Sequence, residues 1–185
     1  MRSFRFVLAI AASFACLPWA SADHVTDVGG SAPAFSLQAA AGTQSGTVTL
    51  DSITADGPAV VVVLRGFPGY QCPLCTRQVG QFLSKAKQFE AKGTSVLFVY
   101  PGPASNLNGR AAEFLRGTTL PKPFTLVLDP DYTFTNAYHL RWNAPRETAY
   151  PTTLVVDQDG KILFSKVSKG HGGRTSPDEI LSKLP

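Results

Sequence analysis

An uninterrupted apolar run at residues 59–64 stands before a glycine- and proline-containing loop that ends in Cys72-Pro-Leu-Cys75. A continuous run of this length predicts a central strand that is covered on both faces. Pro73 suits the first position of a helix, where its missing N–H costs nothing. The cysteine pair is therefore expected at a strand-to-helix junction. Unpaired N–H groups and partial positive charge at a helix start stabilise a thiolate, so the pair indicates redox chemistry.

The chain after the cysteine pair alternates between helical and strand patterns. One apolar stripe at helical spacing predicts a helix that Gly93 ends; it consists of Val79, Phe82, Leu83, Ala86 and Phe89. Apolar runs at 94–100 and 125–128 predict two more strands, with a helix between them at 107–115. A further small helix is expected to turn Phe134, Ala137 and Tyr138 inward.

Antiparallel hairpins are predicted at both ends of this region. Residues 35–37 and 47–50 form the first pair, and residues 153–156 and 161–164 flank a turn that contains Gly160. Ser176 and Pro177 begin the last helix. The resulting order, β-β-β-α-β-α-β-α-β-β-α, predicts an α/β sandwich: a central mixed sheet flanked by helices, with an N-terminal β-hairpin extension.

The first 22 residues have the layout of a cleaved secretory signal peptide. Arg2 and Arg5 precede an apolar stretch at 6–16, which is too short to span a bilayer, and Ala20-Ser21-Ala22 offers a cleavage site. Lipoprotein processing before Cys16 is the less favoured alternative. We expect a periplasmic or secreted protein with a loose lead-in at 23–32 and one domain at 33–185. The expected product is soluble rather than membrane-spanning.

Composition narrows the classes of partner and cofactor. Cleavage removes two of the 17 basic residues and none of the 13 acidic ones, which leaves a net charge of +2 and no basis for a nucleic-acid partner. Only three histidines accompany the two remaining cysteines, so we expect no metal or other cofactor. A copper-binding or interaction module that uses the two thiolates and a histidine stays as an alternative. A purely structural disulfide is disfavoured, because so short a loop yields roughly 2 kcal/mol.

Three segments resemble a known group of redox proteins. The Cys-x-x-Cys helix start and Tyr150-Pro151-Thr152-Thr153 before a hairpin resemble thioredoxin-like proteins, in which that proline is cis and lies against the cysteines. The loop Pro68-x-x-x-Cys72-x-x-Cys75 is closer to peroxiredoxin-like redoxins of the alkyl hydroperoxide reductase C/thiol-specific antioxidant family. The opening from Gly30 to Leu37 and the close from Gly170 to Arg174 are similar to that family as well. The resemblance implies a thioredoxin-like fold and a thiol-dependent antioxidant oxidoreductase.

Two departures from the family pattern concern the site. Cys72 stands where the family has a threonine, and the family's arginine, expected near residues 149–152, is missing. Arg65 or Arg146 could replace that arginine. Besides the two cysteines, the candidate site-lining residues are Pro68, Tyr70, Pro151, Arg65 and Arg146. His171 is expected to be an ordinary loop residue.

Two reactions remain open for the dithiol. In a peroxidase, which we place slightly ahead, Cys75 attacks the peroxide and Cys72 condenses with the sulfenic acid. In a thioredoxin-like exchange enzyme, Cys72 attacks the disulfide of a partner protein and Cys75 resolves the mixed disulfide. Both routes end in a Cys72–Cys75 disulfide, which an external thiol reductant must reopen.

Overall fold

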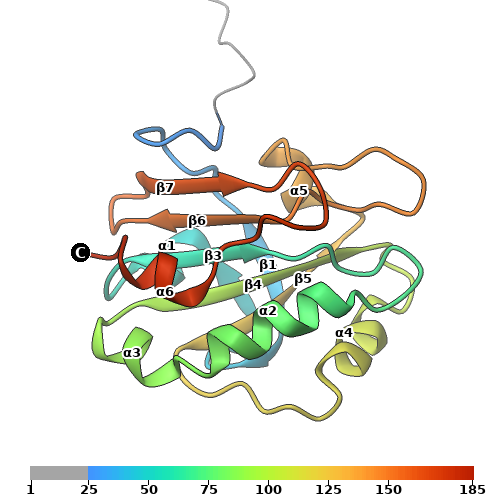
Figure 1. Ribbon diagram of the computed structural model, residues 1–185, viewed down its shortest axis with the longest axis horizontal. Helices are drawn as coiled ribbons and strands as arrows, with labels where there is room; N and C mark the ends of the chain where they lie inside the picture. Colours follow the sequence, from blue (N-terminus) through green and yellow to red (C-terminus); the bar gives the residue numbers. More distant parts are fainter. Residues whose placement is uncertain (1–24) are drawn as a thin grey trace, which may run out of the picture.

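The computed structural model describes residues 25–185, so the expected signal peptide and Cys16 lie outside the described residues. A seven-stranded mixed sheet crosses the molecule in the order β2-β1-β5-β4-β3-β6-β7 (Figure 1). Its strands are β1 (Ser36–Gly42), β2 (Thr47–Thr49), β3 (Ala59–Val63), β4 (Ser95–Gly102), β5 (Phe124–Pro130), β6 (Thr152–Val156) and β7 (Ile162–Val167). β3, β4 and β5 run parallel to one another, whereas the other neighbouring pairs are antiparallel. The expected mixed sheet is confirmed.

Six helices in the described chain cover the two faces of this sheet (Figure 1). Core contacts place α2 (Pro73–Leu83), α3 (Ala86–Ala91), α4 (Leu107–Leu115) and α6 (Pro177–Leu181) on one face. α1 (Leu50–Thr54) and α5 (Thr133–Ala137) lie on the other. None of the helices in the described part of the chain is long and apolar enough to cross a membrane.

β3 is buried on both faces, as its apolar run predicts. Val60 and Val62 join the core under α2, whereas Val61 and Val63 join the core under α1 and α5. Every residue of the strand is fully buried. A strand with two apolar faces is held firmly by packing on both sides. Its carboxyl end, from which the cysteine loop departs, is therefore a fixed point.

The helix that was expected to run to Gly93 is divided in two. At the break the Ser84 hydroxyl donates to the Gln81 carbonyl, and the Lys85 N–H donates to the Phe82 carbonyl in a tighter turn. The change of direction stacks Phe89 on Phe82, with ring centroids 5.6 Å apart. The single stripe in the sequence thus serves two helices, because aromatic packing outweighs continuation of the first one.

Three smaller expectations also need correction. Ala137 is exposed, whereas Phe134 and Tyr138 are buried as predicted. The short helix α1 was not foreseen; Thr49 and Ser52 begin it with a reciprocal capping box. The expected loose lead-in is fastened to the sheet from Gly29 onward, because the backbone of residues 29–32 exchanges hydrogen bonds of 2.8 Å with residues 160–162. These backbone groups satisfy the open edge beside the β6–β7 turn.

Candidate active site

The two cysteines lie at the start of α2, at the strand-to-helix junction that the sequence predicts. Cys72 is the N-cap residue, Pro73 is the first helical residue, and Cys75 lies in the first turn. Both are free thiols. Cys75 is completely buried, whereas Cys72 retains 3% exposure. Cys72 is therefore the thiol that a partner molecule can reach.

Cys72 is poised as a thiolate. The hydrogen bond from the Cys75 thiol is the largest influence on it and outweighs burial, so that the pKa of Cys72 falls to about 5. Its sulfur makes no regular capping hydrogen bond, but the amides of Cys75 and Leu74 and the charge of Arg174 add to the stabilisation of the anion. A thiolate with this environment is a nucleophile at neutral pH.

Cys75 has the opposite character. Burial, followed by the hydrogen bond to Cys72, raises the pKa of Cys75 well above its ordinary value. The backbone N–H of Arg65 donates to the Cys75 sulfur over 3.3 Å and orients it. The two sulfurs thus share one proton unequally: Cys72 is the anion, and Cys75 is the donor.

The side chain of Arg65 is anchored in a buried network next to the cysteine pair. Its Nε donates to Glu147 over 2.5 Å, and its Nη atoms donate to the Tyr70 hydroxyl and the Arg146 carbonyl, each over 2.6 Å. The Thr148 hydroxyl donates to the Arg65 carbonyl. Burial alone would lower the pKa of Arg65, but the bonds to Glu147 and Tyr70 raise it above its ordinary value. Arg65 is therefore a permanent cation with fixed partners.

Gly66 lets the chain leave β3 in this geometry. It has a φ of +67°, and a Cβ at this position would collide with the Pro101 carbonyl. The next residue, Phe67, donates its N–H to the same carbonyl over 2.9 Å. Only glycine combines this left-handed conformation with so close an approach of two backbones.

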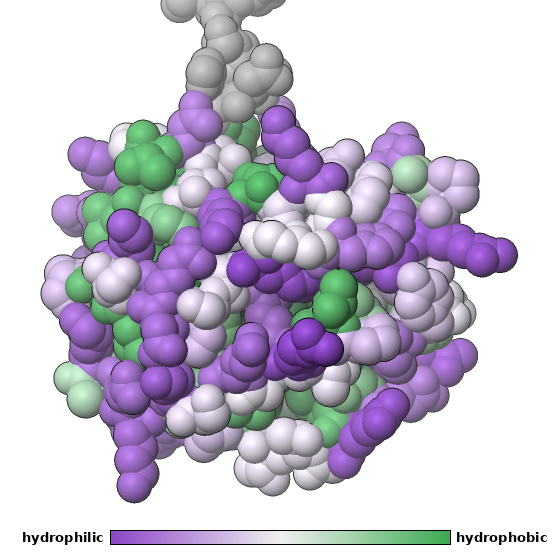
Figure 2. All heavy atoms as spheres, in the orientation of Figure 1, coloured by the Kyte–Doolittle hydropathy of each residue, from purple (hydrophilic) through white to green (hydrophobic). Residues whose placement is uncertain are grey.

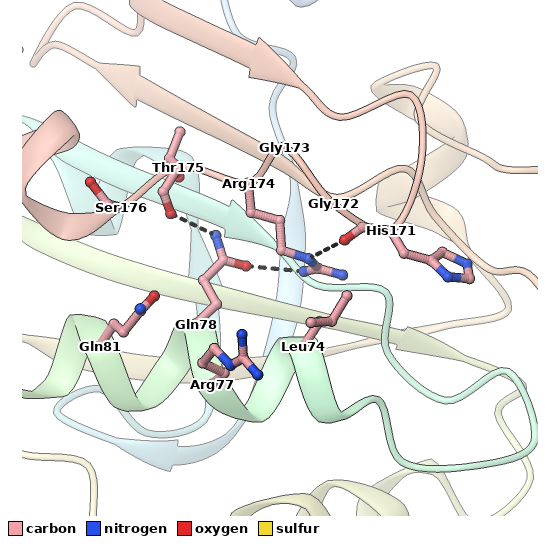
Figure 3. A pocket seen from close by; sticks show the side chains of 10 residues that line it. All are labelled: Leu74, Arg77, Gln78, Gln81, His171, Gly172, Gly173, Arg174, Thr175 and Ser176. Carbon is pink, nitrogen blue, oxygen red and sulfur yellow. Dashed lines mark hydrogen bonds between the residues drawn. The ribbon is translucent and has the colours of Figure 1, made fainter.

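A second arginine approaches the cysteines from the loop before α6. Arg174 places Nη2 3.9 Å from the Cys72 sulfur. Its Nη1 donates to the Gln78 side chain and its Nε donates to the His171 carbonyl, each over 3.0 Å. Figure 3 shows Gln78 reaching from α2 to this loop and binding both Arg174 and Thr175. The guanidinium beside the thiolate is thus held from two sides.

Glu147 links the two arginine regions. Besides Arg65 it contacts His171, whose Nε2 lies 2.9 Å from Oε1. Burial would raise the pKa of Glu147, but its bonds to Arg65 and His171 lower it. His171 also packs against the Trp142 ring, with centroids 5.2 Å apart. His171, expected to be an ordinary loop residue, is therefore a structural link between residues 146–148 and the loop that carries Arg174.

The predicted site-lining residues differ in where they lie and in what they contact. Arg65 and Tyr70 join the network beside the cysteines. Arg146 is exposed and takes part through its carbonyl oxygen, which accepts from Arg65. Pro68 lies half-buried in the loop between β3 and α2.

Pro151 is buried one residue before Thr152, which pairs with Val63 at the carboxyl end of β3. The expected cis peptide bond is wrong: in the described chain the cis bond is the one between Lys122 and Pro123. The backbone around Pro151 is tied on both sides, because Tyr150 donates to Leu140 and Ser168 donates to the Pro151 carbonyl. These bonds hold an extended entry into β6.

The copper alternative requires a histidine next to the two thiols, and no described histidine forms a metal-binding group with them. Within residues 25–185 no group of three or more histidine, cysteine, aspartate or glutamate side chains is placed to hold a metal ion. His171 is engaged with Glu147 instead.

Three residues of the site were missed at the level of sequence: Glu147, Gln78 and Arg174. Arg174 belongs to the stretch from Gly170 that resembles the family's close, and that signal could have identified it. Gln78 and Glu147 carry no local signal, because their side-chain partners lie between 24 and 97 positions away in the sequence.

A model of the AhpC/TSA family matches residues 28–165. No curated protein matches the chain.

Solved structures share the fold at low sequence identity. Mycobacterium tuberculosis AhpC has a TM-score of 0.65 at 20% identity, over 85% of this chain and 90% of that chain. M. tuberculosis peroxidoxin BcpB has a TM-score of 0.63 at 23% identity, over 85% and 95%. A Chlorobium tepidum protein assigned as thiol:disulfide interchange protein DsbE has a TM-score of 0.62 at 22% identity, over 86% and 99%. These likenesses show the thioredoxin-like fold.

Proposed function

Because the chain belongs to the AhpC/TSA family, it is a thiol-dependent oxidoreductase, and we propose that its Cys72–Cys75 dithiol exchanges with disulfides of partner molecules. The observation that carries this proposal is the difference in pKa and exposure between the two cysteines. Cys72, with a pKa of about 5 and residual exposure, has the properties of the attacking thiolate. Cys75, buried and protonated, has those of the resolving thiol.

The reaction balances as a reduction of the partner. The Cys72 thiolate attacks one sulfur of the partner disulfide, a Cys72–partner bond forms, and the other partner sulfur leaves as a thiolate. The Cys75 proton passes to that leaving thiolate. The Cys75 sulfur then attacks Cys72 and releases the second partner sulfur. The partner gains two electrons, and the dithiol loses them as the Cys72–Cys75 disulfide forms. An external thiol reductant then restores the dithiol.

The groups around the pair support each step. Arg174 faces the sulfur that must stay ionised before the attack. The Arg65 amide donates to the Cys75 sulfur, where negative charge develops during resolution. A fixed donor aimed at developing charge lowers the barrier of such a step.

Peroxide reduction is the second candidate, favoured by the family match. In that reaction a thiolate attacks the peroxide, a sulfenic acid and water or an alcohol form, and condensation of the second thiol releases water. Cys75 was the expected peroxidatic residue, but the thiol with the lowered pKa is Cys72. For this chain we therefore assign the attack on peroxide to Cys72 as well.

Insulin reduction in the presence of a thiol reductant tests the exchange function. We expect the wild type to accelerate it, Cys72→Ser to have no effect, and Cys75→Ser to accumulate a mixed disulfide that mass spectrometry detects at Cys72. The two variants are matched, since each replaces one sulfur by oxygen in the same turn. Full activity of Cys72→Ser would refute the assignment.

Stopped-flow mixing of the reduced protein with hydrogen peroxide tests the second candidate. Thiol loss no faster than that of free cysteine would refute the peroxidase function.

We also propose export by cleavage after Ala22, with action in the periplasm or outside the cell. N-terminal sequencing of protein from cell fractions checks this, and recovery of the full-length chain from the cytoplasm would contradict it.

A further inference from the structure

A pocket of about 310 Å³ lies between α2 and the loop before α6, and Leu74, which stands between the two cysteines in the sequence, is among its lining residues. One wall is α2 from Leu74 to Gln81, and the other is the loop from His171 to Ser176. In Figure 3 the Arg174 side chain enters from the loop at the Leu74 end of the helix. The same guanidinium lies 3.9 Å from the Cys72 sulfur, so Arg174 connects the pocket with the attacking thiolate. Its volume is within the range of ligand-binding sites.

The charge of this pocket has one sign. Arg77 enters it from α2 and Arg174 from the loop, and no acidic residue lines it. The carboxylates near it are paired with cations: Glu147 with Arg65 and His171, Asp178 with Lys85, and Glu179 with Lys166. In Figure 2 strongly hydrophilic residues lie over α2, and hydrophobic residues form small separate patches on this face. A concave surface with two guanidinium groups attracts carboxylates.

Arg174 is prepared to bind an anion. Its position is fixed by Gln78 and by the His171 carbonyl, so little side-chain freedom remains to be lost on binding. The contacts to Gln78, His171 and Cys72 use three of the five N–H bonds that a guanidinium offers. Two donors are therefore left for a ligand at the mouth of the pocket.

The loop that forms the second wall of the pocket exposes its backbone at Gly172. Gly172 has no positive φ, and a Cβ at this position would meet nothing within 4 Å, so neither conformation nor packing demands a glycine there. The absent side chain instead leaves backbone open to an approaching chain. From Leu74 to Gln81 the helix rises about 10 Å, the length of about three residues of extended peptide.

We propose that this pocket binds an acidic segment next to the disulfide of a peptide or protein substrate. The substrate sulfur meets Cys72, and a carboxylate two or three residues away meets Arg174 and Arg77. This inference rests on the proposed exchange function and adds a substrate class to it: disulfides flanked by aspartate or glutamate.

Short peptides with one cysteine test the inference. Each peptide carries its cysteine as a mixed disulfide with neutral pyridine-2-thiol, and the residue two positions after it is Glu, Gln or Lys. Cys72 attacks the peptide sulfur and releases the pyridine thiol, which is followed by absorbance in stopped flow. We expect the Glu peptide to react about fivefold faster than the Gln peptide at low salt, and the Lys peptide to react slowest. High salt should shrink these differences.

Two charge-neutralising variants sharpen this test. Arg77→Gln should bring the Glu and Gln peptides to within twofold of each other. Lys87→Gln, which removes one charge from the exposed surface of α3, should keep the wild-type preference. Equal rates for the Glu and Gln peptides, or a preference that survives in Arg77→Gln, would overturn the acidic-substrate inference while exchange itself stands. Reaction of all three peptides no faster than with free cysteine would overturn the exchange function as well.

Discussion

The Arg65 guanidinium and the Glu147 carboxylate form an ion pair of 2.5 Å whose side chains are 3% and 11% exposed. The backbone of the same arginine donates to the Cys75 sulfur. One residue therefore connects the resolving cysteine with a segment that lies 82 positions away in sequence. The ion pair holds in place the amide that orients Cys75.

Glu147→Gln should destabilise the protein by about 3 kcal/mol, because it leaves the buried Arg65 charge without a counter-ion. Urea unfolding measures this loss. Glu113→Gln is the matched control: it removes a carboxylate from the exposed pair with Arg110 and should cost less than about 1 kcal/mol. Equal losses of unfolding free energy in the two variants would show that the buried Arg65–Glu147 pair stabilises the fold no more than the exposed pair does.

The rate of Cys72 alkylation by iodoacetamide should follow ionisation with a midpoint at about pH 5, the pKa of its thiol. The reactive form is the thiolate, so the rate should be nearly constant from pH 7 to pH 9. A Cys72→Ser variant, which keeps the Cys75 thiol, gives the control for site assignment, because alkylation with this midpoint should be lost in it. A midpoint near the ordinary 9.0 would refute the assignment of Cys72 as the poised nucleophile.

Cys75→Ala should raise the pKa of Cys72 more than Arg174→Gln does. The hydrogen bond from Cys75 is the largest stabilising influence on the Cys72 thiolate, whereas the Arg174 charge is a smaller one. Titration of thiolate absorbance in the ultraviolet gives both shifts. The reverse order would mean that the arginine charge, and not the neighbouring thiol, sets the acidity of the pair.

The reduced protein should become more stable as the pH rises from 5 to 9. The pKa of Cys72 is about 5 in the folded chain against an ordinary 9.0, so the unfolded chain binds the extra proton in this window. Above pH 9 the raised pKa of Cys75 acts in the opposite direction. The measurement is the free energy of unfolding of the reduced wild type relative to Cys72→Ser across pH. A difference that stays flat from pH 5 to 9 contradicts the lowered pKa.

Much of the fold follows from local sequence patterns. The apolar run of β3 and the turn between β6 and β7 predict strands that the structure contains. α1 escaped prediction because five residues are too few to show a period. The division of the helix after Leu83 escaped it because the stacking of Phe82 on Phe89 is a tertiary contact.

The candidate site was predictable only where it is local. The spacing of Cys72, Pro73 and Cys75 indicates the start of a helix. The unequal acidity of the two cysteines depends instead on the hydrogen bond between them and on the deeper burial of Cys75, with a smaller contribution from Arg174, 102 residues away. Spacing alone carries no information about such partners, so the attacking cysteine could not be chosen from the sequence.

Gly66 has no reactive atom, yet its left-handed backbone against Pro101 directs the chain between Arg65 and the cysteine loop. Any side chain at this position would push two strand ends apart and carry the Arg65 amide away from Cys75. In a library of all single substitutions, position 66 should thus be as intolerant as the cysteines themselves. A redox centre of this kind can be lost by adding a single methyl group to a residue that never meets the substrate.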